Sequence, residues 1–208
     1  MEDVLHTSHL PYNPRIPVVC MDEASKQRIG AVQEPLPVQP GKPRGADDEY
    51  ERKGVCNAFV CGEPLRGWRH VKVTDRRTKR DWAECLRELL EVHFPKAPLM
   101  RLVLDNLNTH TGASLYEAFS PRRARQLLDR LEFHHTPKHA SWLNMAEIEL
   151  SVLSSQCLDR RIPDRDTLIG EVGAWMHDRN VEQSTIDWRF TTADSRIKLK
   201  RLYPAILP

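Results

Sequence analysis

The sequence lacks any run of 18 or more apolar residues, which excludes a membrane-spanning helix. Its first residues do not combine a basic segment with an apolar one, so we expect no secretory signal. Only five cysteines are present, an odd number scattered along the chain, and we interpret them as reduced thiols of a cytoplasmic protein. What remains is an ordinary globular composition, with 208 residues, 40% hydrophobic and 29% charged, enough for one large domain or two small ones.

The net charge is only +2, so the overall charge balance says little about partners. Positive side chains are nevertheless clustered, with seven Lys or Arg residues and one acid between Arg66 and Arg80. Shorter basic clusters lie at 122–125 and 196–201. Clustered cations on a nearly neutral chain either neutralise phosphates locally or form ordinary solvated faces, and charge alone does not decide between these.

The hydrophobic periodicity indicates a run of strands followed by alternating helices and strands. The expected strands cover 17–21, 54–62, 68–74, 99–104 and 131–135. The expected helices begin near Thr78, Ser120, Asn144, Asp164 or Asp166, and Ala193. This order predicts an α/β domain over 17–204, with a mixed sheet and helices on both faces. Residues 1–16 are interpreted as an N-terminal tail or linker, 34–45 as a loop and 205–208 as a C-terminal tail.

Two aspartates directly follow apolar strands. Asp22 and Asp105 occupy the position where ligand groups gather at the carboxyl ends of strands in α/β sheets. If the two strands are parallel neighbours, their carboxylates approach each other, and a divalent cation between them relieves the repulsion. A third acid is expected from the helix after Asn144, where Glu147 and Glu149 lie about 200° apart around the axis and cannot both face one site. Each acid alone also has a simpler interpretation as a turn or helix-end residue.

The segments around these acids decide between the interpretations. Leu104–His110 contains Asp-Asn-x-x-x-His, and His135–Leu150 contains Leu-Asn-x-x-Glu; further motif segments are Cys20–Gln27 and Glu63–Thr78. In this order and at this separation, the set resembles the catalytic domain of transposases of the bacterial insertion-sequence 630 family, a branch of the mariner-like superfamily. The resemblance covers roughly residues 16–204 and implies a ribonuclease H-like fold with a mixed five-stranded sheet flanked by helices.

The resemblance also implies the site. The family's three acids fall on Asp22, Asp105 and Glu147, which leaves Glu149 with a structural or supporting role. These acids would hold two Mg²⁺ ions, for which Mn²⁺ would substitute, with Asp22 bridging the metals. The implied activity is cut-and-paste transposition, in which DNA cleavage frees a 3′-hydroxyl that then attacks target DNA. The implied partners are therefore the element ends and the target DNA, held by at least a homodimer.

Six further residues are candidates for DNA contact or for supporting the acids. Asn106 and His110 are candidates to orient the scissile phosphate or the nucleophile, although His110 has an alternative role in helix capping or packing. Lys138 and His139 are candidate contacts to the DNA backbone. Trp142 is expected either to stack on an extruded base or to fill the core, and Asn144 belongs with the same group.

The sequence departs from the family pattern in three respects. Asp105 and Glu147 are separated by 41 residues, longer than usual, with the extra length falling near 119–130. Ala140 stands where relatives often have Gly, which is tolerable unless the backbone φ angle is positive. Only some 16 residues precede the first strand, too few for the helix-turn-helix module that reads the element ends. We expect that module to be supplied in trans or by frameshifting, and DNA binding without it to be weak and salt-sensitive.

Two rival functions remain open at this stage. One is a catalytically silent product that pairs with full-length transposase and inhibits it. The other is a cellular nuclease with the same ribonuclease H-like fold, because a fold by itself does not determine the reaction.

Overall fold

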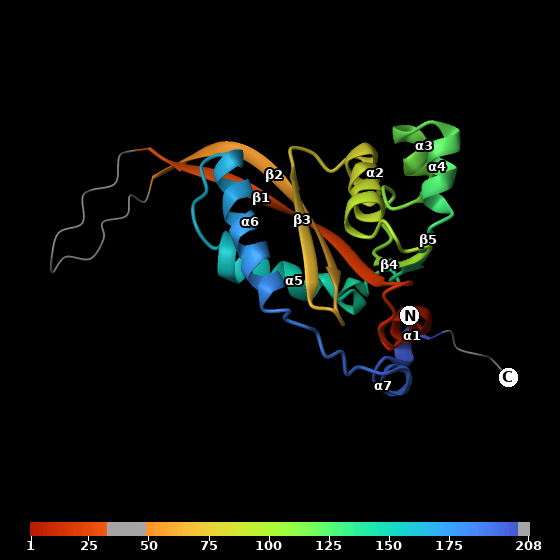
Figure 1. The fold of residues 1–208 in the computed structure, drawn as a ribbon. Helices are drawn as coiled ribbons and strands as arrows, with labels where there is room; N and C mark the ends of the chain where they lie inside the picture. Colours follow the sequence, from red (N-terminus) through yellow and green to blue (C-terminus); the bar gives the residue numbers. More distant parts are fainter. Residues whose placement is uncertain (33–48, 204–208) are drawn as a thin grey trace.

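The computed structural model describes residues 1–32 and 49–203, so the predicted loop at 34–45 and the predicted tail at 205–208 lie outside the described residues. Five strands form one sheet in the order β3-β2-β1-β4-β5 (Figure 1). Their bounds are Val18–Ala31 for β1, Tyr50–Glu63 for β2, Trp68–Thr74 for β3, Met100–Leu104 for β4 and Leu131–His135 for β5. Strands β1, β2 and β3 pair antiparallel, whereas β4 pairs parallel with both β1 and β5. The predicted mixed five-stranded sheet is therefore confirmed.

Strand β1 is much longer than expected. The prediction ended it before Asp22, but the strand continues to Ala31 because β2 pairs with it along most of its length. The parallel pairing with β4 stops earlier, at Cys20 opposite Val103. Asp22 consequently lies inside a strand, just beyond the end of the parallel pairing, and the expectation that it stands at a strand tip is wrong. Asp22 lies opposite Val60 of β2, and this antiparallel pairing holds the backbone at Asp22 in a defined position.

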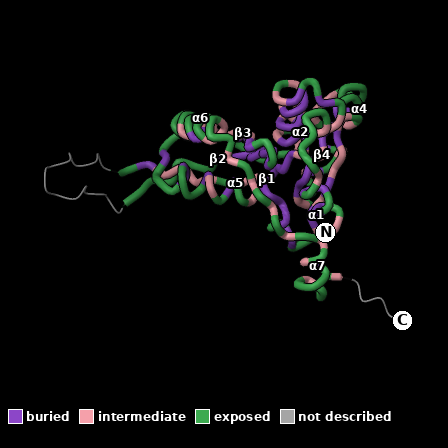
Figure 2. The backbone as a smooth tube through the Cα atoms, turned by 60° about the horizontal axis from the view of Figure 1, so that its bottom comes forward, coloured by how far each residue is buried: buried purple, intermediate pink, exposed green. Residues whose placement is uncertain are grey.

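Helices cover both faces of the sheet, as predicted. One face carries α2 (Lys79–Glu88), α3 (Gly112–Ala118) and α4 (Pro121–Leu128), and the other carries α5 (Ala146–Leu153) and α6 (Arg165–Val181). Alternation along the strands separates the two cores: Val19 and Met21 of β1 pack toward α2, and Ala58 and Val60 of β2 pack toward α5 and α6. Figure 2 shows the buried residues running along the strands and the inner sides of these helices.

The predicted helix starts agree with the observed ones to within two residues. Thr78 caps α2 through a capping box with Asp81, Ser120 precedes α4, and Asp164 caps α6. The predicted helix at 144–158 divides into α5 and a π-helical turn, η3, at Ser154–Leu158. Helix α3 was not expected, and together with α4 it accounts for the extra length between the second and third acids.

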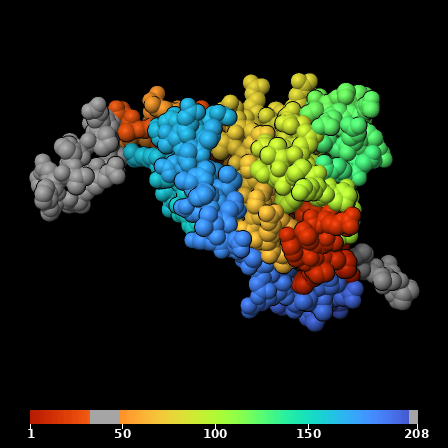
Figure 3. All heavy atoms as spheres, viewed as in Figure 1, coloured from red at the N-terminus to blue at the C-terminus, as the bar shows by residue number. Residues whose placement is uncertain are grey.

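The N-terminal segment is not the irregular tail that its composition indicates. Residues Glu2–Ser8 form helix α1, in which Val4 and Leu5 are fully buried. These two side chains pack with Cys20 of β1 and Val103 of β4 in a third core cluster. In Figure 3, α1 lies against the C-terminal part of the described chain, where Glu2 accepts two hydrogen bonds from Arg196 of α7 (Thr192–Lys198) at 2.7 and 2.8 Å. Segments at both ends of the described chain therefore close over the same edge of the sheet.

A buried ion pair joins the sheet to α5. Arg69 of β3 donates two hydrogen bonds of 3.0 Å to the carboxylate of Glu149, and the two side chains are 1% and 4% exposed. The remaining donors of Arg69 reach the carbonyl oxygens of Gly67, Arg179 and Ser184 at 3.1, 2.6 and 2.6 Å. This arrangement satisfies the guanidinium almost completely and agrees with a structural role for Glu149.

We expect Glu149→Gln to destabilise the protein by about 3–5 kcal/mol, because the substitution leaves the guanidinium of Arg69 buried without its counter-charge. Urea unfolding followed by circular dichroism measures the change. The matched control is Asp187→Asn, which removes the exposed partner of Arg189 and is expected to change stability by less than about 1 kcal/mol. Equal effects of the two substitutions would contradict the structural role of the buried pair.

Candidate functional site

The candidate site is built around Asp22 on the face of β1 that looks toward α5. Its carboxylate is only 7% exposed, and its Oδ1 accepts a hydrogen bond of 2.8 Å from the backbone amide of Glu23. Burial, together with the negative charges of Glu147, Asp105 and Glu23, raises the pKa of Asp22 to about 7 despite that hydrogen bond. The same charges show that the second and third acids lie within electrostatic range of the first.

Asp105 follows the last residue of β4 and is held by a buried histidine. His110 is 0% exposed and donates from Nδ1 to Asp105 Oδ1 at 2.6 Å. Its Nε2 lies 2.9 Å from Glu23 Oε2, and its ring stacks on Trp82 of α2 with centroids 5.4 Å apart. The imidazole therefore lies between the carboxylate of Asp105, at the end of β4, and that of Glu23, on β1. It lies on the face of the sheet that packs against α2.

The charges of this bridge support one another. Burial alone would lower the pKa of His110, but its hydrogen bond to Asp105 and the nearby charge of Glu23 outweigh burial and raise that pKa to about 9. Burial likewise opposes ionisation of Asp105, yet the hydrogen bond and charge of His110 bring the pKa of Asp105 below its ordinary value. At neutral pH the site thus contains an imidazolium between two carboxylates, and Asp105 is ionised and fixed in orientation.

Glu147 is brought to the site by the loop and helix that follow β5. Asn144, which is fully buried, donates from its side chain to the carbonyl oxygen of Met21 at 2.8 Å. Its Oδ1 accepts a hydrogen bond of 3.2 Å from the amide of Ala146 at the start of α5. Asn144 therefore ties the first turn of α5 to the residue before Asp22, and Glu147, half-buried in that turn, lies beside β1 as a result.

The three acids do not form a compact group of ligand atoms. Among the described residues, one group of three potential ligands has all its ligand atoms within 4.8 Å of one another, and that group is formed by other side chains. That Asp22, Asp105 and Glu147 form one site stays a prediction; the charges of Glu147 and Asp105 both contribute to the raised pKa of Asp22.

The other predicted site residues separate into buried and exposed groups. His110 and Asn144 are fully buried: His110 is hydrogen-bonded to the acid Asp105, and Asn144 to the backbone of Met21 beside Asp22. Asn106 is exposed, and its side chain donates to the carbonyl oxygen of Thr136 beyond β5. Lys138 and His139 are exposed in the following loop.

Trp142 does not fill the core. Its residue is 43% exposed, and its ring packs edge-on against Phe190 with centroids 5.4 Å apart. The core interpretation is therefore wrong, and the aromatic face remains available for stacking. Ala140 has a φ angle of −131°, so no glycine is required there, whereas the neighbouring His139 takes the positive φ angle of 66°.

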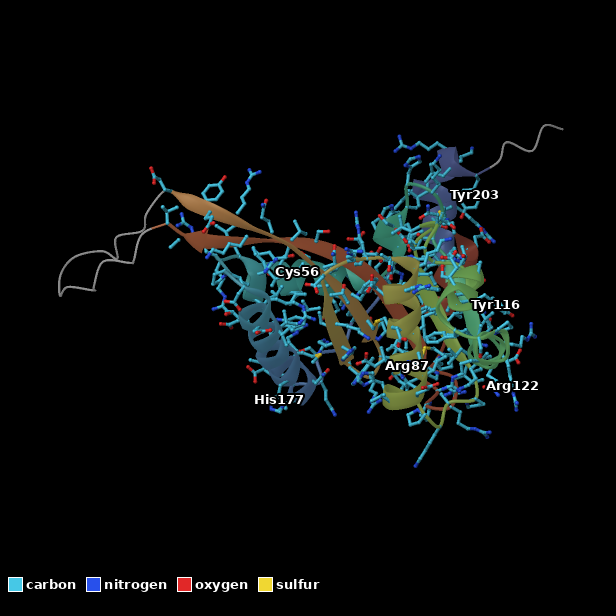
Figure 4. All side chains as sticks on the ribbon, turned by 90° about the horizontal axis from the view of Figure 1, so that it is seen from above. Cys56, Arg87, Tyr116, Arg122, His177 and Tyr203 are labelled. Carbon is cyan, nitrogen blue, oxygen red and sulfur yellow. The ribbon has the colours of Figure 1, made fainter. Side chains whose placement is uncertain are left out.

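Several cations of the basic clusters pair with acids within the fold. Arg69 is the buried partner of Glu149, and Lys72 lies 2.7 Å from Glu88. In the second cluster, Arg123 pairs with Glu91 and Arg125 with Asp129, while Figure 4 shows the labelled Arg122 on the outer side of α4. A run of positive charge in the sequence is therefore not one continuous phosphate-binding surface.

Sequence reasoning missed Glu23 as a member of the site. Its neighbour Asp22 was chosen, but alternation along β1 sends the two side chains to opposite faces of the sheet. The side chain of Glu23, 3% exposed, meets His110, 87 positions later in the chain. The only local signal was an acid at the adjacent strand position, and that signal does not identify a partner so distant in sequence.

Comparisons with known proteins agree with this geometry. A sequence profile described as DDE superfamily endonuclease matches residues 17–169. The structure is similar to that of the Mos1 mariner paired end complex with Mn, with a TM-score of 0.56 and 15% identity over 88% of this chain and 56% of that chain. It is also similar to the Mos1 Strand Transfer Complex, with a TM-score of 0.57 and 14% identity over 88% of this chain and 58% of that chain.

A third similar structure is the Mos1 transposase paired-end complex with left transposon end. The TM-score is 0.53, with 14% identity over 95% of this chain and 60% of that chain. The chain thus spans 56–60% of the length of these transposase chains, and the likeness supports the ribonuclease H-like fold. A search of curated protein sequences finds no significant match. On the profile match, which covers most of its length, the chain belongs to the DDE superfamily endonucleases.

Proposed function

We propose that this chain is the catalytic domain of a DNA transposase of the insertion-sequence 630 type, which cleaves DNA and transfers the freed 3′ end to a target. The observation that supports the proposal is the position of Asp22 on β1, Asp105 directly after β4 and Glu147 in the first turn of α5, with the charges of Glu147 and Asp105 contributing to the raised pKa of Asp22. The three acids follow the Asp-Asp-Glu order of the motif segments. Cytoplasmic action on nucleoid DNA is part of the same proposal.

The residues present fit divalent magnesium. All three donors are carboxylates, the hard oxygen ligands that Mg²⁺ and Mn²⁺ prefer. Burial and mutual repulsion already disfavour ionised Asp22, as its raised pKa shows, and a nearby cation relieves both costs. We propose that Asp22, Asp105 and Glu147 hold two such ions, which when bound activate the attacking oxygen and stabilise the leaving one.

The residues around the acids then have distinct tasks. His110 holds the Asp105 carboxylate in one orientation, and Asn144 holds the turn that presents Glu147. Exposed Lys138 and His139 contact the phosphate backbone, and Trp142 offers a face for an unstacked base. Two element ends are held together in a complex that contains at least two copies of this chain.

The test combines a supercoiled plasmid with a labelled duplex that carries the element's terminal sequence and a pre-cut 3′-hydroxyl. With Mg²⁺ or Mn²⁺, the proposed transposase is expected to join the label covalently to the plasmid. Metal-dependent nicking without labelled joint molecules would identify a nuclease instead. A chain that neither nicks nor joins, yet lowers the activity of an added full-length transposase, would identify a regulator.

His110→Gln is expected to weaken the response to metal rather than abolish folding. Loss of a group that orients a metal-binding carboxylate typically costs about 10–100-fold in metal affinity or activity, and we expect an effect in this range on the Mg²⁺ concentration for half-maximal nicking. The matched control is His177→Gln, a histidine exposed on α6 and labelled in Figure 4. If both variants need the same Mg²⁺ concentration as the wild type, His110 does not position Asp105.

A further inference from the structure

A second group of potential metal ligands lies away from the three acids, between β3 and the end of α2. It consists of His70 on β3, Glu88 at the last position of α2, and His93 in the π-helical turn η1 (Leu89–His93). Their ligand atoms all lie within 4.8 Å of one another, and no other group in the described parts of the chain meets that criterion. We propose that these three side chains form a zinc site, separate from the catalytic acids.

The distances suit a tetrahedral ion. Glu88 Oε1 lies 3.2 Å from His70 Nε2 and 3.8 Å from His93 Nε2. Ligand atoms about 2.0–2.1 Å from a tetrahedral Zn²⁺ are about 3.3 Å apart, so small side-chain adjustments bring all three onto one ion. Two imidazoles with one carboxylate form a set that zinc accepts, whereas an all-oxygen set is what magnesium prefers.

The imidazole nitrogens that face Glu88 are not engaged by any other group of the described chain. In the described part of the chain, the Nε2 atoms of His70 and His93 are both buried and make no aligned hydrogen bond. Buried polar atoms normally find a partner, so two such nitrogens aimed at one carboxylate oxygen call for an explanation. The rings lie with centroids 4.2 Å apart, and Trp68 covers them from one side, which restricts their rotation.

The backbone is shaped to bring two of the ligands together. In a regular α-helix, residues five positions apart lie about 140° apart around the axis, so Glu88 and His93 would point in different directions. The π-helical turn removes much of that angle, and its hydrogen bond from the amide of Phe94 to the carbonyl oxygen of Leu89 measures 2.8 Å. Such π-turns are rare and recur at functional sites.

Lys72 sets the orientation of the carboxylate. Its Nζ lies 2.7 Å from Glu88 Oε2, the oxygen that does not face the histidines. This contact leaves Oε1 for the ion and holds the carboxylate plane, as outer groups commonly do for metal ligands. Three protein ligands leave one position for water, and the bound ion would connect β3 to the end of α2.

The experiment measures zinc binding to the tag-free chain by isothermal titration, beside a variant carrying Asp22→Asn and Asp105→Asn. One equivalent is expected to remain bound in the variant that lacks both aspartates, because the proposed site does not include the catalytic acids. His93→Ala and His70→Gln are each expected to lower the zinc affinity by about 100-fold or more, since loss of an outer group alone costs about 10–100-fold. His177→Ala is the matched control and should bind as the wild type does.

Cobalt provides a second readout that does not depend on affinity alone. Co²⁺ in the proposed site should show the visible absorption of a four-coordinate ion, and His93→Ala should abolish it while circular dichroism shows the fold intact. Partly exposed His93 keeps the test valid if His70→Gln fails to fold. Wild-type zinc affinity in His93→Ala, or loss of all zinc binding in the Asp22→Asn, Asp105→Asn protein, would overturn the proposal without bearing on the transposase function.

Discussion

Asp105→Asn is expected to lower the rate of metal-dependent plasmid nicking by about a thousandfold or more, because a lost metal ligand removes several kcal/mol of transition-state stabilisation. Asp105 is the acid whose ionised form the structure supports best, since His110 holds its carboxylate at 2.6 Å and lowers its pKa. An amide at this position keeps the shape of the side chain but loses its charge. Initial rates of conversion from supercoiled to open-circular plasmid, at saturating Mg²⁺, measure the effect.

The control for this prediction is Asp129→Asn, which removes an exposed acid paired with Arg125 at the end of α4. Its nicking rate should stay within about twofold of the wild type, because surface ion pairs contribute little. A wild type that nicks no faster than Asp105→Asn would show that the observed cleavage comes from a contaminating nuclease, and the assignment of the three acids would then fail.

Asp22→Asn is expected to stabilise the metal-free protein at pH 8 while it abolishes nicking. The pKa of Asp22 is raised from 3.8 to about 7 in the folded state, so above pH 7 folding must keep a buried carboxylate charged. A shift of this size corresponds to an upper bound of about 4 kcal/mol, and we expect a gain of about 1–4 kcal/mol. The new amide can still accept the hydrogen bond from Glu23 through its oxygen.

The direction of the pH dependence follows from the raised pKa. Below pH 3.8 both states carry the proton, and the wild type loses nothing by folding. As the pH rises toward 7, the unfolded state ionises first and the wild type becomes less stable than the variant. Urea unfolding in EDTA should therefore show a small difference in unfolding free energy between the wild type and Asp22→Asn at pH 4, and a large difference at pH 8. Saturating Mg²⁺ should reduce this difference in unfolding free energy at pH 8, because it stabilises the wild type alone.

Asp187→Asn, at an exposed position, controls for the substitution itself and should not alter stability by more than about 0.5 kcal/mol at either pH. If Asp22→Asn proves equally stable or less stable than the wild type at pH 8, the strained carboxylate cluster is not present. That result would also remove the main physical reason to place a cation at this site.

Local features of the fold were predictable because their causes lie within a few residues. The capping box of Thr78 and Asp81, the first-turn Pro121 and the apolar run of β4 each depend on neighbours in the chain. The predicted end of a strand was wrong where pairing with a segment distant in sequence determines it: β1 extends to Ala31 because β2 pairs with it. Helix α1 was missed for a similar reason, since Val4 and Leu5 gain their burial from β1 and β4.

The sequence by itself determined the DDE superfamily and the order of the five strands, and it predicted the three acids, because motif spacing and hydrophobic periodicity are properties of the linear chain. Only the tertiary structure decided which side chains contact those acids or the backbone beside them. Glu23 with His110, and Asn144 with Met21, are joined by contacts across 87 and 123 positions. Such contacts depend on strand register and helix packing, which place side chains to within a hydrogen-bond length and leave no periodic trace in the sequence.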